Sequence, residues 1–276
     1  MGYATLVKPG TKVKLTSIDS HADGGLTREA GEKRFAKLNA KLDALQEEMY
    51  AAGHHGMLLV LQGMDTSGKD GAIRSVLVNV NPQGLRIESF KVPTADELSH
   101  DFLWRVHKVA PGRGELTVFN RSHYEDVLVV RVHKLASEAR WKARYDQINA
   151  FESLLAANDI IVRKVYLHIS KREQEERLLA REQDVEKAWK LSAGDWKERE
   201  LWDAYQEAYE DALGRCSTEG APWHIVPADR KWFRNLAVAE ILVDALEERR
   251  DDWRAALKQM SETRLAELAA YRAEQK

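Results

Sequence analysis

The sequence has little of several features that place a chain in a broad class. Its single cysteine, Cys216, excludes an internal disulfide and a zinc site built on several cysteines. No apolar run approaches the roughly 20 residues that a membrane-spanning helix needs. The N-terminal stretch MGYATLVKPGTKVKL lacks the apolar segment of a secretory signal peptide. We therefore expect a soluble, cytoplasmic protein with no membrane partner.

The chain also lacks an excess of either charge. Its 276 residues include 42 Lys and Arg and 44 Asp and Glu, a formal net charge of −2. The overall composition therefore predicts no nucleic acid partner, and any anionic ligand must meet local basic groups. One basic group is formed by Arg131, His133, Lys134, Arg140, Lys142 and Arg144. It is either a track for a polyanion or, as charge runs usually are, a solvated surface.

Short apolar runs alternate with segments of helical periodicity. We expect strands at 57–63, 85–90, 116–120, 160–169 and 223–229. We expect helices at 27–52, 70–80, 95–109, 122–135, 138–157, 171–190, 195–215 and 231–273. This alternation predicts an α/β fold, a three-layer, doubly wound parallel sheet of about five strands. Residues 1–26 are expected to form an N-terminal arm, and no repeat or linker divides the chain, so we expect one domain over 1–276.

The stretch GMDTSGKDG, residues 63–71, fits the phosphate-binding loop pattern G-x-x-x-x-G-K. An apolar strand precedes it and a helical pattern follows, which is the context that such a loop requires. Backbone N–H groups and the lysine side chain would then bind phosphate. The residues expected to bind it are Gly63, Met64, Thr66, Ser67, Gly68, Lys69, Asp70 and Gly71. The alternative is that the glycines only allow a tight turn.

Two acidic residues make this loop unusual. Asp70 stands where the pattern has Ser or Thr, whose hydroxyl binds Mg²⁺. Asp65 places a carboxylate inside a loop that binds anions, and phosphate would repel it unless a cation lay between them. Asp65 is therefore either a replacement ligand for Mg²⁺ or an N-cap of the following helix.

The apolar segment LTVF ends in Asn120 and Arg121. The carboxyl ends of parallel strands share one edge of a sheet, so both residues should lie near the glycine loop. Kinases with such loops usually carry an acidic metal ligand at a strand end, and here the residue is Asn120. Glu125 and Asp126 follow. Either both only complement the start of a helix, or Glu125 supplies the charge that Asn120 lacks and acts on the acceptor or the metal.

The segment 171–190 carries Arg177 and Arg181 four residues apart, with Arg172 one turn earlier. Such arginines could act from a helical lid, expected at about 171–194, on the transferring phosphoryl group. They could equally pair with nearby glutamates on a solvated face. Residues 226–229, Val-Pro-Ala-Asp, either line an adenine pocket or start a helix capped by Asp229. The charged C-terminal helix, 231–276, is expected to pack or self-associate.

Taken together, these motifs resemble the polyphosphate kinase 2 family. The stretches that carry the resemblance are GMDTSGKDG, VNPQG, SFKVPTADELSHDFLWRVHK, FNRSHYEDVL and AWKLS, and they span roughly Thr11 to Leu246. The resemblance implies a phosphate-loop kinase fold similar to thymidylate kinase, with a helical lid. It also implies reversible phosphoryl transfer from inorganic polyphosphate to AMP or ADP, giving ADP and ATP, with Mg²⁺ or alternatively Mn²⁺.

The resemblance extends to individual residues. Asp65 and Lys69 match the aspartate and lysine of the family's loop, Arg121 matches its strand-end arginine, and Arg177 and Arg181 fall in its lid. The family commonly has Asp-Arg-Ser-Trp-Tyr-Asn after the third strand. This chain has Asn-Arg-Ser-His-Tyr-Glu over 120–125, which resembles the subgroup, class III, that phosphorylates AMP as well as ADP.

That subgroup assignment makes Glu125 a candidate active-site residue. We expect Asn120, Arg121 and Glu125 to bind the nucleotide, and Asp65, Asn120 and Glu125 to hold the metal. The family also implies a homodimer or homotetramer. The alternatives are an ATP-dependent nucleoside monophosphate kinase and a phosphate-loop binding module without catalysis.

Overall fold

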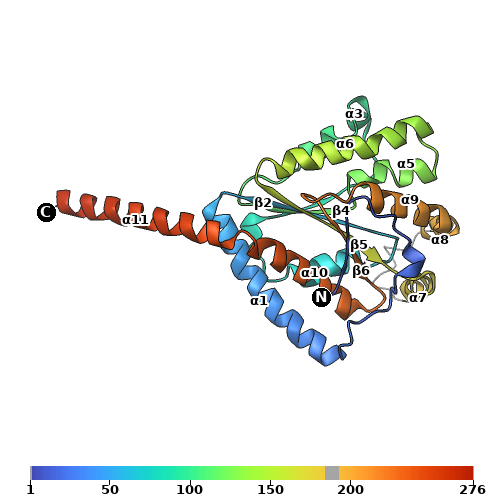
Figure 1. The fold of residues 1–276 in the computed structure, drawn as a ribbon, viewed down its shortest axis with the longest axis horizontal. Helices are drawn as coiled ribbons and strands as arrows, with labels where there is room; N and C mark the ends of the chain where they lie inside the picture. Colours follow the sequence, from blue (N-terminus) through green and yellow to red (C-terminus); the bar gives the residue numbers. More distant parts are fainter. Residues whose placement is uncertain (1, 184–192, 276) are drawn as a thin grey trace.

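The computed structural model describes residues 2–183 and 193–275 (Figure 1). A six-stranded sheet has the order β1-β6-β5-β2-β4-β3. Its strands are β1 (Thr5–Val7), β2 (Gly56–Gly63), β3 (Leu85–Ser89), β4 (Leu116–Asn120), β5 (Ile160–His168) and β6 (Trp223–Pro227). Neighbouring strands are parallel except β1, which runs antiparallel to β6. The expected α/β fold with a mostly parallel, doubly wound sheet is confirmed, and β1 is a sixth strand within the segment predicted to be an arm.

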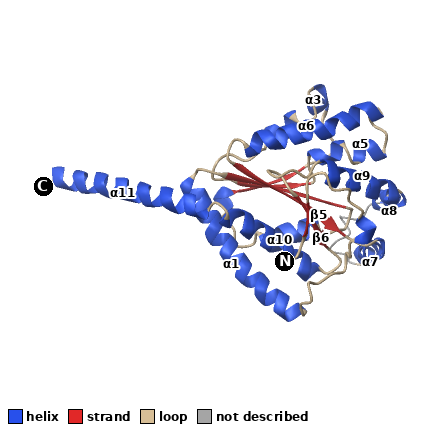
Figure 2. Cartoon of the chain, in the orientation of Figure 1, coloured by secondary structure: helices blue, strands red, loops and turns tan. Residues whose placement is uncertain are grey.

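Helices cover both faces of the sheet (Figure 2). They are α1 (Arg28–Ala52), α2 (Lys69–Val76), α3 (Ala95–Ser99), α4 (Trp104–His107), α5 (Val129–Val132), α6 (Glu138–Ala156), α7 (Lys171–Glu182), α8 (Ala193–Glu200), α9 (Trp202–Arg215), α10 (Lys231–Glu247) and α11 (Arg250–Glu274). Alternate side chains of β2 enter two separate cores, as the pleat of a strand requires. Leu58 and Val60 pack with α6 and α9, whereas Met57, Leu59 and Leu61 pack with α1, α2 and α10.

The strand register brings the carboxyl ends of the parallel strands to one edge. Leu61 of β2 lies opposite Asn120 of β4, and Ser89 of β3 lies on the other side of Asn120. On the opposite flank, Gly63 lies beside Leu167 of β5. The loop that follows β2 is therefore at the centre of this edge, and the residues after β4 adjoin it.

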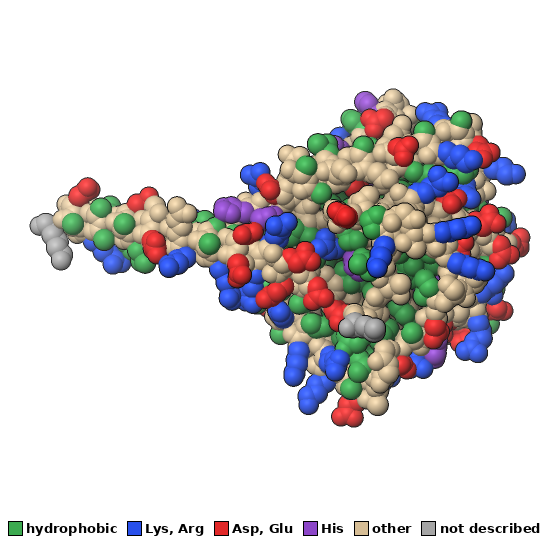
Figure 3. Space-filling view, viewed as in Figure 1, with side chains coloured by type: hydrophobic (Ala, Val, Ile, Leu, Met, Phe, Trp, Pro, Cys, Tyr) green, Lys and Arg blue, Asp and Glu red, His purple; other side chains and the backbone are tan. Residues whose placement is uncertain are grey.

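Several expected helices are divided in the structure. The segment 231–273 forms α10 and α11, separated at 248–249, because the apolar α10 stays on the sheet while α11 leaves the body. Arg250 pairs with Glu48, and the Trp253 indole donates to His55, which ties the start of α11 to α1 and to the turn that follows α1. The rest of α11 projects from the body (Figure 3). The segments 95–109, 122–135 and 195–215 are likewise divided into shorter helices.

Within the described residues, no helix is both long and apolar enough to cross a membrane. The predicted helix 171–190 ends at Glu182 as α7, and residues 184–190 of that segment lie outside the described residues, as does the whole of AWKLS (188–192).

A buried ion pair lies beneath the short 3₁₀ helix His123–Asp126. The Lys164 ammonium of β5 donates to a Glu152 carboxylate oxygen from α6, and also to the Tyr124 hydroxyl at 2.9 Å. The second Glu152 oxygen accepts from Tyr124 at 2.9 Å and lies 3.2 Å from His123 Nε2. The charge of Lys164 offsets the burial of Glu152 and lowers the pKa of that carboxyl. This cluster fixes the segment that joins Arg121 to Glu125.

We predict that Lys164→Met lowers the free energy of unfolding by about 3–5 kcal/mol, because it leaves the Glu152 carboxylate buried without its cation. Urea denaturation at pH 7 measures the change. Lys142→Met is the matched control, since Lys142 pairs with Glu138 where both side chains are more than half exposed. Equal losses in the two variants would contradict a structural role for the buried pair.

Candidate active site

A crevice of about 870 Å³ opens at the carboxyl edge of the sheet, beside the glycine loop. It is lined by Asp65, Thr66, Gly68, Lys69, Asp70, Gly71, Ser89, Phe90, Lys91, Asn120, Arg121, Arg177, Ala180, Arg181, Asp195, Lys231 and Arg234. These residues come from six regions of the chain. Seven of the 17 are Lys or Arg, so the crevice is strongly cationic and suits an anionic ligand.

The glycine loop has the backbone of an anion-binding nest. Gly68 is the N-cap of α2 with φ +97°, and no side chain caps the helix. Thr66 also has a positive φ of +62°. The first N–H groups of α2 are therefore without a side-chain cap at the crevice, where the helix dipole favours negative charge. Asp65 does not serve as the N-cap, so that alternative is excluded.

Lys69 is buried at the start of α2. Its ammonium donates to the carbonyls of Gly63 at 2.7 Å and Met64 at 3.3 Å, so its side chain curls back over the loop. Burial and, to a smaller extent, the neighbouring Arg121 lower the pKa of Lys69 to about 8 against the opposing effect of Asp65. Lys69 thus lies at the centre of the nest with its charge held in a poorly solvated position.

Asp65, Arg121 and Glu125 form an ion-pair chain at the end of β4. Arg121 pairs with Asp65 and lies 3.7 Å from a Glu125 oxygen. Burial alone would raise the pKa of Asp65, but the charges of Arg121 and Lys69 hold it below its usual value. Arg121 has a positive φ of +62°, and its N–H donates to the Leu61 carbonyl, which directs the residue toward the loop.

The same residues provide oxygen ligands suited to Mg²⁺. One carboxylate oxygen of Glu125, Oε1, is buried without a hydrogen-bond partner, and Asp65 lies nearby in the same small cavity. Asn120 uses its amide nitrogen to donate to Asp70, which leaves its amide oxygen for another partner. Across the described residues, no three His, Cys, Asp or Glu side chains form a complete metal site. Such a set fits Mg²⁺ that is completed by phosphate oxygens and water.

Arg177 of α7 lines the crevice, but its guanidinium donates hydrogen bonds to other groups of the protein. Its Nε donates to Glu173, and its two terminal nitrogens donate to the carbonyls of Thr66, Ser67, Ala228 and Asp229. All five donors of the guanidinium are therefore engaged. Arg177 holds α7, the glycine loop and the end of β6 together.

Arg181, one turn further along α7, is more open to the crevice. Its Nη1 lies 3.3 Å from Asp195 of α8, and its side chain is 25% exposed. Burial and the nearby Asp65 raise the pKa of Asp195, against the effect of Arg181. The expected lid at 171–194 thus includes α7, and its residues 184–192 lie outside the described part of the chain.

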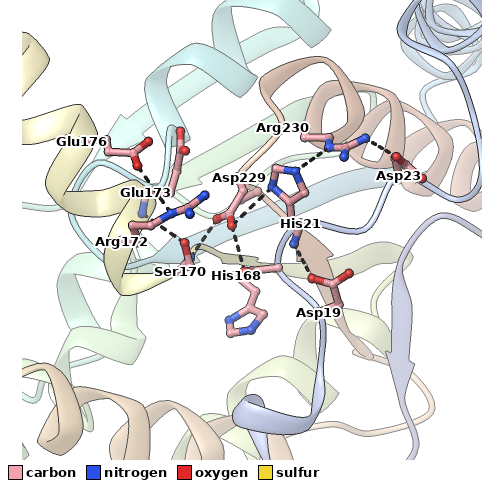
Figure 4. Close-up of polar contacts among 12 residues, drawn as sticks. Asp19, His21, Asp23, His168, Ser170, Arg172, Glu173, Glu176, Asp229 and Arg230 are labelled. Carbon is pink, nitrogen blue, oxygen red and sulfur yellow. Dashed lines mark hydrogen bonds and ion pairs between the residues drawn. The ribbon is translucent and has the colours of Figure 1, made fainter.

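Asp229 does not take the helix-capping role that was one of its two alternatives in the sequence. Its carboxylate accepts from the Ser170 backbone N–H at 2.8 Å and from the Ser20 hydroxyl at 3.0 Å (Figure 4). Arg230, and not Asp229, is the N-cap of α10. Asp229 therefore ties the N-terminal segment to the start of α7.

The basic group at 131–144 is largely engaged in ion pairs. Arg131 pairs with Asp211, His133 contacts Glu198 at 3.0 Å, Lys142 pairs with Glu138, and Arg144 pairs with Asp126. This arrangement favours the solvated-surface interpretation over a polyanion track.

The crevice also contains residues that the sequence analysis did not assign to the site. Lys231 and Arg234 enter from α10, Asp195 from α8, and Phe90 and Lys91 from the end of β3. Phe90 and Lys91 directly follow a predicted strand, so their placement at the carboxyl edge could have been inferred. Arg234 is separated from the loop by more than 160 residues, and no spacing rule connects the two.

Comparisons with known proteins agree with this architecture. The sequence model of the family described as polyphosphate kinase 2 matches residues 25–254. An AMP/ADP-polyphosphate phosphotransferase from Meiothermus ruber is 50% identical over 245 residues, which cover 87% of this chain and 91% of that protein. An ADP-polyphosphate phosphotransferase from Rhodopseudomonas palustris is 47% identical over 219 residues, covering 75% of this chain and 76% of that protein.

A solved structure gives the same result for the fold. The crystal structure of polyphosphate kinase 2 from Arthrobacter aurescens TC1 superimposes with a TM-score of 0.84 at 42% identity, covering 90% of this chain and 92% of that one. Together with a family model that matches most of the sequence, this similarity shows that the chain belongs to the polyphosphate kinase 2 family.

Proposed function

We propose that the protein transfers phosphoryl groups from inorganic polyphosphate to AMP and ADP, making ADP and ATP, and that the transfer is reversible. The observation that carries the proposal is the backbone nest around Lys69 with Arg121, Arg181 and Arg234 on the same crevice. This set provides charge for a chain of phosphates. Relatives named as AMP/ADP-polyphosphate and ADP-polyphosphate phosphotransferases support the choice of substrates.

The acceptor would approach from the β4 side of the loop. In phosphoryl transfer the attacking and leaving oxygens lie roughly in line, and positioning and charge provide most of the catalysis. The phosphate oxygen of AMP or ADP is ionised near neutral pH, because the second pKa of such a phosphate is about 6. A strong general base is therefore not required. Asn120, Arg121 and Glu125, at the end of β4, are placed to orient that phosphate.

Lys69 and Arg121 would stabilise the charge of the moving group. Both are buried or half-buried beside the nest, where electrostatic interactions are stronger than in water. Arg181 would contribute from α7 after exchanging its contact with Asp195 for phosphate. Because all five donors of Arg177 are engaged by the protein, we assign it the role of holding the loop rather than of contacting the phosphoryl group.

Asp65 and Glu125, with the Asn120 amide oxygen, would hold the divalent ion. A bound Mg²⁺, or Mn²⁺ in its place, would offset the repulsion between donor and acceptor phosphates. Glu125 would also neutralise Arg121 in the absence of substrate, since the two side chains are within 3.7 Å.

An ATP-dependent nucleoside monophosphate kinase is the second candidate, because it shares the sheet and the loop. The end of β6 disfavours it. The backbone carbonyls of Ala228 and Asp229 accept hydrogen bonds from Arg177. They are therefore not available to bind an adenine base, which was one alternative for residues 226–229.

We further propose that the protein forms a homodimer or homotetramer. The projecting part of α11 supports self-association, because it exposes Leu265, Leu268 and Tyr271. These side chains recur every three residues and so lie close to one face of the helix.

We predict that the purified protein converts AMP to ADP and ATP when it is given long-chain polyphosphate and Mg²⁺ without any nucleoside triphosphate. Chromatography of the nucleotides follows the products, and a parallel reaction starts from ADP. Excess EDTA should abolish both reactions. Conversion of AMP only when ATP replaces polyphosphate would establish the nucleoside monophosphate kinase instead.

We predict that Lys69→Met lowers kcat by about 10²–10³-fold, as expected for the loss of a preorganised group that stabilises the transition state. Lys41→Met is the matched control. Lys41 lies on α1, pairs with Glu247 and is outside the crevice, so this variant should keep the wild-type rate. If Lys69→Met kept more than a tenth of the rate with an unchanged thermal melting curve, the nest would not be the site of transfer.

We predict that kcat/KM for polyphosphate falls about tenfold per pH unit above pH 8, since the pKa of Lys69 is about 8 and only the charged ammonium binds phosphate. The free energy of unfolding changes with pH in the opposite direction to the rate. The unfolded lysine binds its proton up to about pH 10.4, so loss of the buried charge stabilises the fold between these pH values. A rate profile that stays flat from pH 7.5 to 9.5 would show that charge on Lys69 is not required.

A further inference from the structure

Arg234 covers the glycine loop from the first turn of α10. Its side chain is buried, with the residue only 3% exposed, yet it lines the crevice. A Cβ atom added at Gly68 would collide with Arg234 Nη1, and one added at Gly71 would lie 3.2 Å from Arg234 Nη2. The guanidinium therefore lies directly against Gly68 and Gly71, the glycines on either side of Lys69.

Carboxylates balance the charges of the arginines around Arg234, but within the described residues none balances the charge of Arg234 itself. Arg121 pairs with Asp65, Arg181 with Asp195, and Arg177 with Glu173. Arg234 donates from Nε and Nη2 to the amide oxygen of Asn235, at 3.1 and 2.7 Å. Within the described residues no carboxylate pairs with Arg234, and its Nη1 donates to no acceptor.

Such a cation is unfavourable in the free protein. Burial and, to a smaller extent, the adjacent Arg177 lower the pKa of Arg234 to about 10. A buried charge without a counter-ion destabilises a fold, so its presence beside an anion nest indicates that a ligand supplies the missing negative charge. The free Nη1 is also the nitrogen nearest to Gly68, and thus to the nest itself.

The crevice extends from the loop in two directions. Asn120, Ser89 and Lys91 line it on the side of β4 and β3, whereas Arg234 and Lys231 line it on the side of β6 and α10. Donor and acceptor must approach the moving phosphoryl group from opposite sides for in-line transfer. If the acceptor lies on the β4 side, the rest of the donor leads toward α10.

The β6 side favours a donor without a base or ribose. The backbone after β6 is closed, since the carbonyls of Ala228 and Asp229 accept from Arg177. The Asp229 carboxylate also accepts from the Ser20 hydroxyl and from the Ser170 backbone N–H (Figure 4). Ala228 is fully buried. What this side presents to a ligand is the charge of Arg234.

We propose that Arg234 binds the phosphate next to the one transferred and so selects an inorganic polyphosphate chain as the donor. The inference rests on the proposed function and adds a specificity-determining residue to it. One phosphate would take the free Nη1 of Arg234 together with the N–H groups at Gly68 and Lys69, and the following phosphates would continue past Lys231. The α- and β-phosphates of ATP have the same chemistry, so the test must separate the two donors.

The test compares wild-type protein with Arg234→Met, which keeps the length of the side chain and removes its charge. We expect KM for polyphosphate to rise at least tenfold at saturating AMP, with KM for AMP within twofold of wild type. The slope of log KM against log salt concentration should also become smaller by about one, because one phosphate contact is lost. Arg234→Lys should recover part of the affinity, as a point charge without the planar fork does.

Two further measurements distinguish the loss of a phosphate contact from a general loss of folding. Without ligand, Arg234→Met should melt at the same or a higher temperature than wild type, since it removes an unbalanced buried charge. Calorimetric titration with tripolyphosphate should show the loss of affinity, while ATP binding changes less than twofold. Arg28→Met is the matched control, because Arg28 is 75% exposed on α1, lies outside the crevice and should leave KM unchanged.

The outcomes are distinguishable from failure of the proposed function. If wild-type protein does not use polyphosphate, the proposed function itself is wrong. If wild-type protein uses polyphosphate and Arg234→Met keeps its KM and salt slope, only the role of Arg234 is overturned. A loss of ATP affinity with unchanged polyphosphate affinity would also overturn it, because the subsite would then belong to a nucleotide.

Discussion

The crevice depends on one constraint, the crowding of positive charge around the backbone nest that follows β2. Lys69 and Arg234 are buried with lowered pKa values, and Arg121 and Arg177 lie beside them. Like charges at this density repel one another, and burial removes the water that would otherwise screen them. The fold tolerates the crowding because carboxylates pair with some of these cations and backbone carbonyls accept from others. The positive charge that no carboxylate balances marks the place where anionic substrates bind.

The surrounding structure holds these cations in place from several directions. Arg177 joins α7 to the loop and to the end of β6, and Asp229 joins that same end to the N-terminal segment. On the other flank, the buried Lys164–Glu152 pair fixes the 3₁₀ helix between Arg121 and Glu125. Both supports are polar and buried, so each has a defined geometry that apolar packing alone would not impose. Precise placement matters here because phosphoryl transfer is catalysed mainly by position and charge.

Much of the fold could be predicted from the sequence, because buried parallel strands are nearly continuous apolar runs and their carboxyl ends share an edge. The short strand Thr5–Val7 could not, since three residues in a polar segment show no periodicity, and its pairing with β6 depends on contacts more than 200 residues away. The loop, Lys69, Asp65 and Arg121 were likewise found from motif and strand order. The role of Arg177 was not evident, because its partners are backbone carbonyls, which have no signature in the sequence. Arg234 was missed because only the packing of α10 on α2 brings it to Gly68.

The central claim is that a chain of inorganic phosphates ends in the nest around Lys69, with the acceptor on the β4 side and the rest of the chain toward α10. A crystal structure with polyphosphate and a non-reactive AMP analogue tests it most directly. We expect chain phosphates at the N–H groups of residues 63–71 and against Arg234, with the nucleotide phosphate between Arg121 and Asn120. A chain bound on another surface, or a nucleoside triphosphate in the nest with its base over the end of β6, would contradict it.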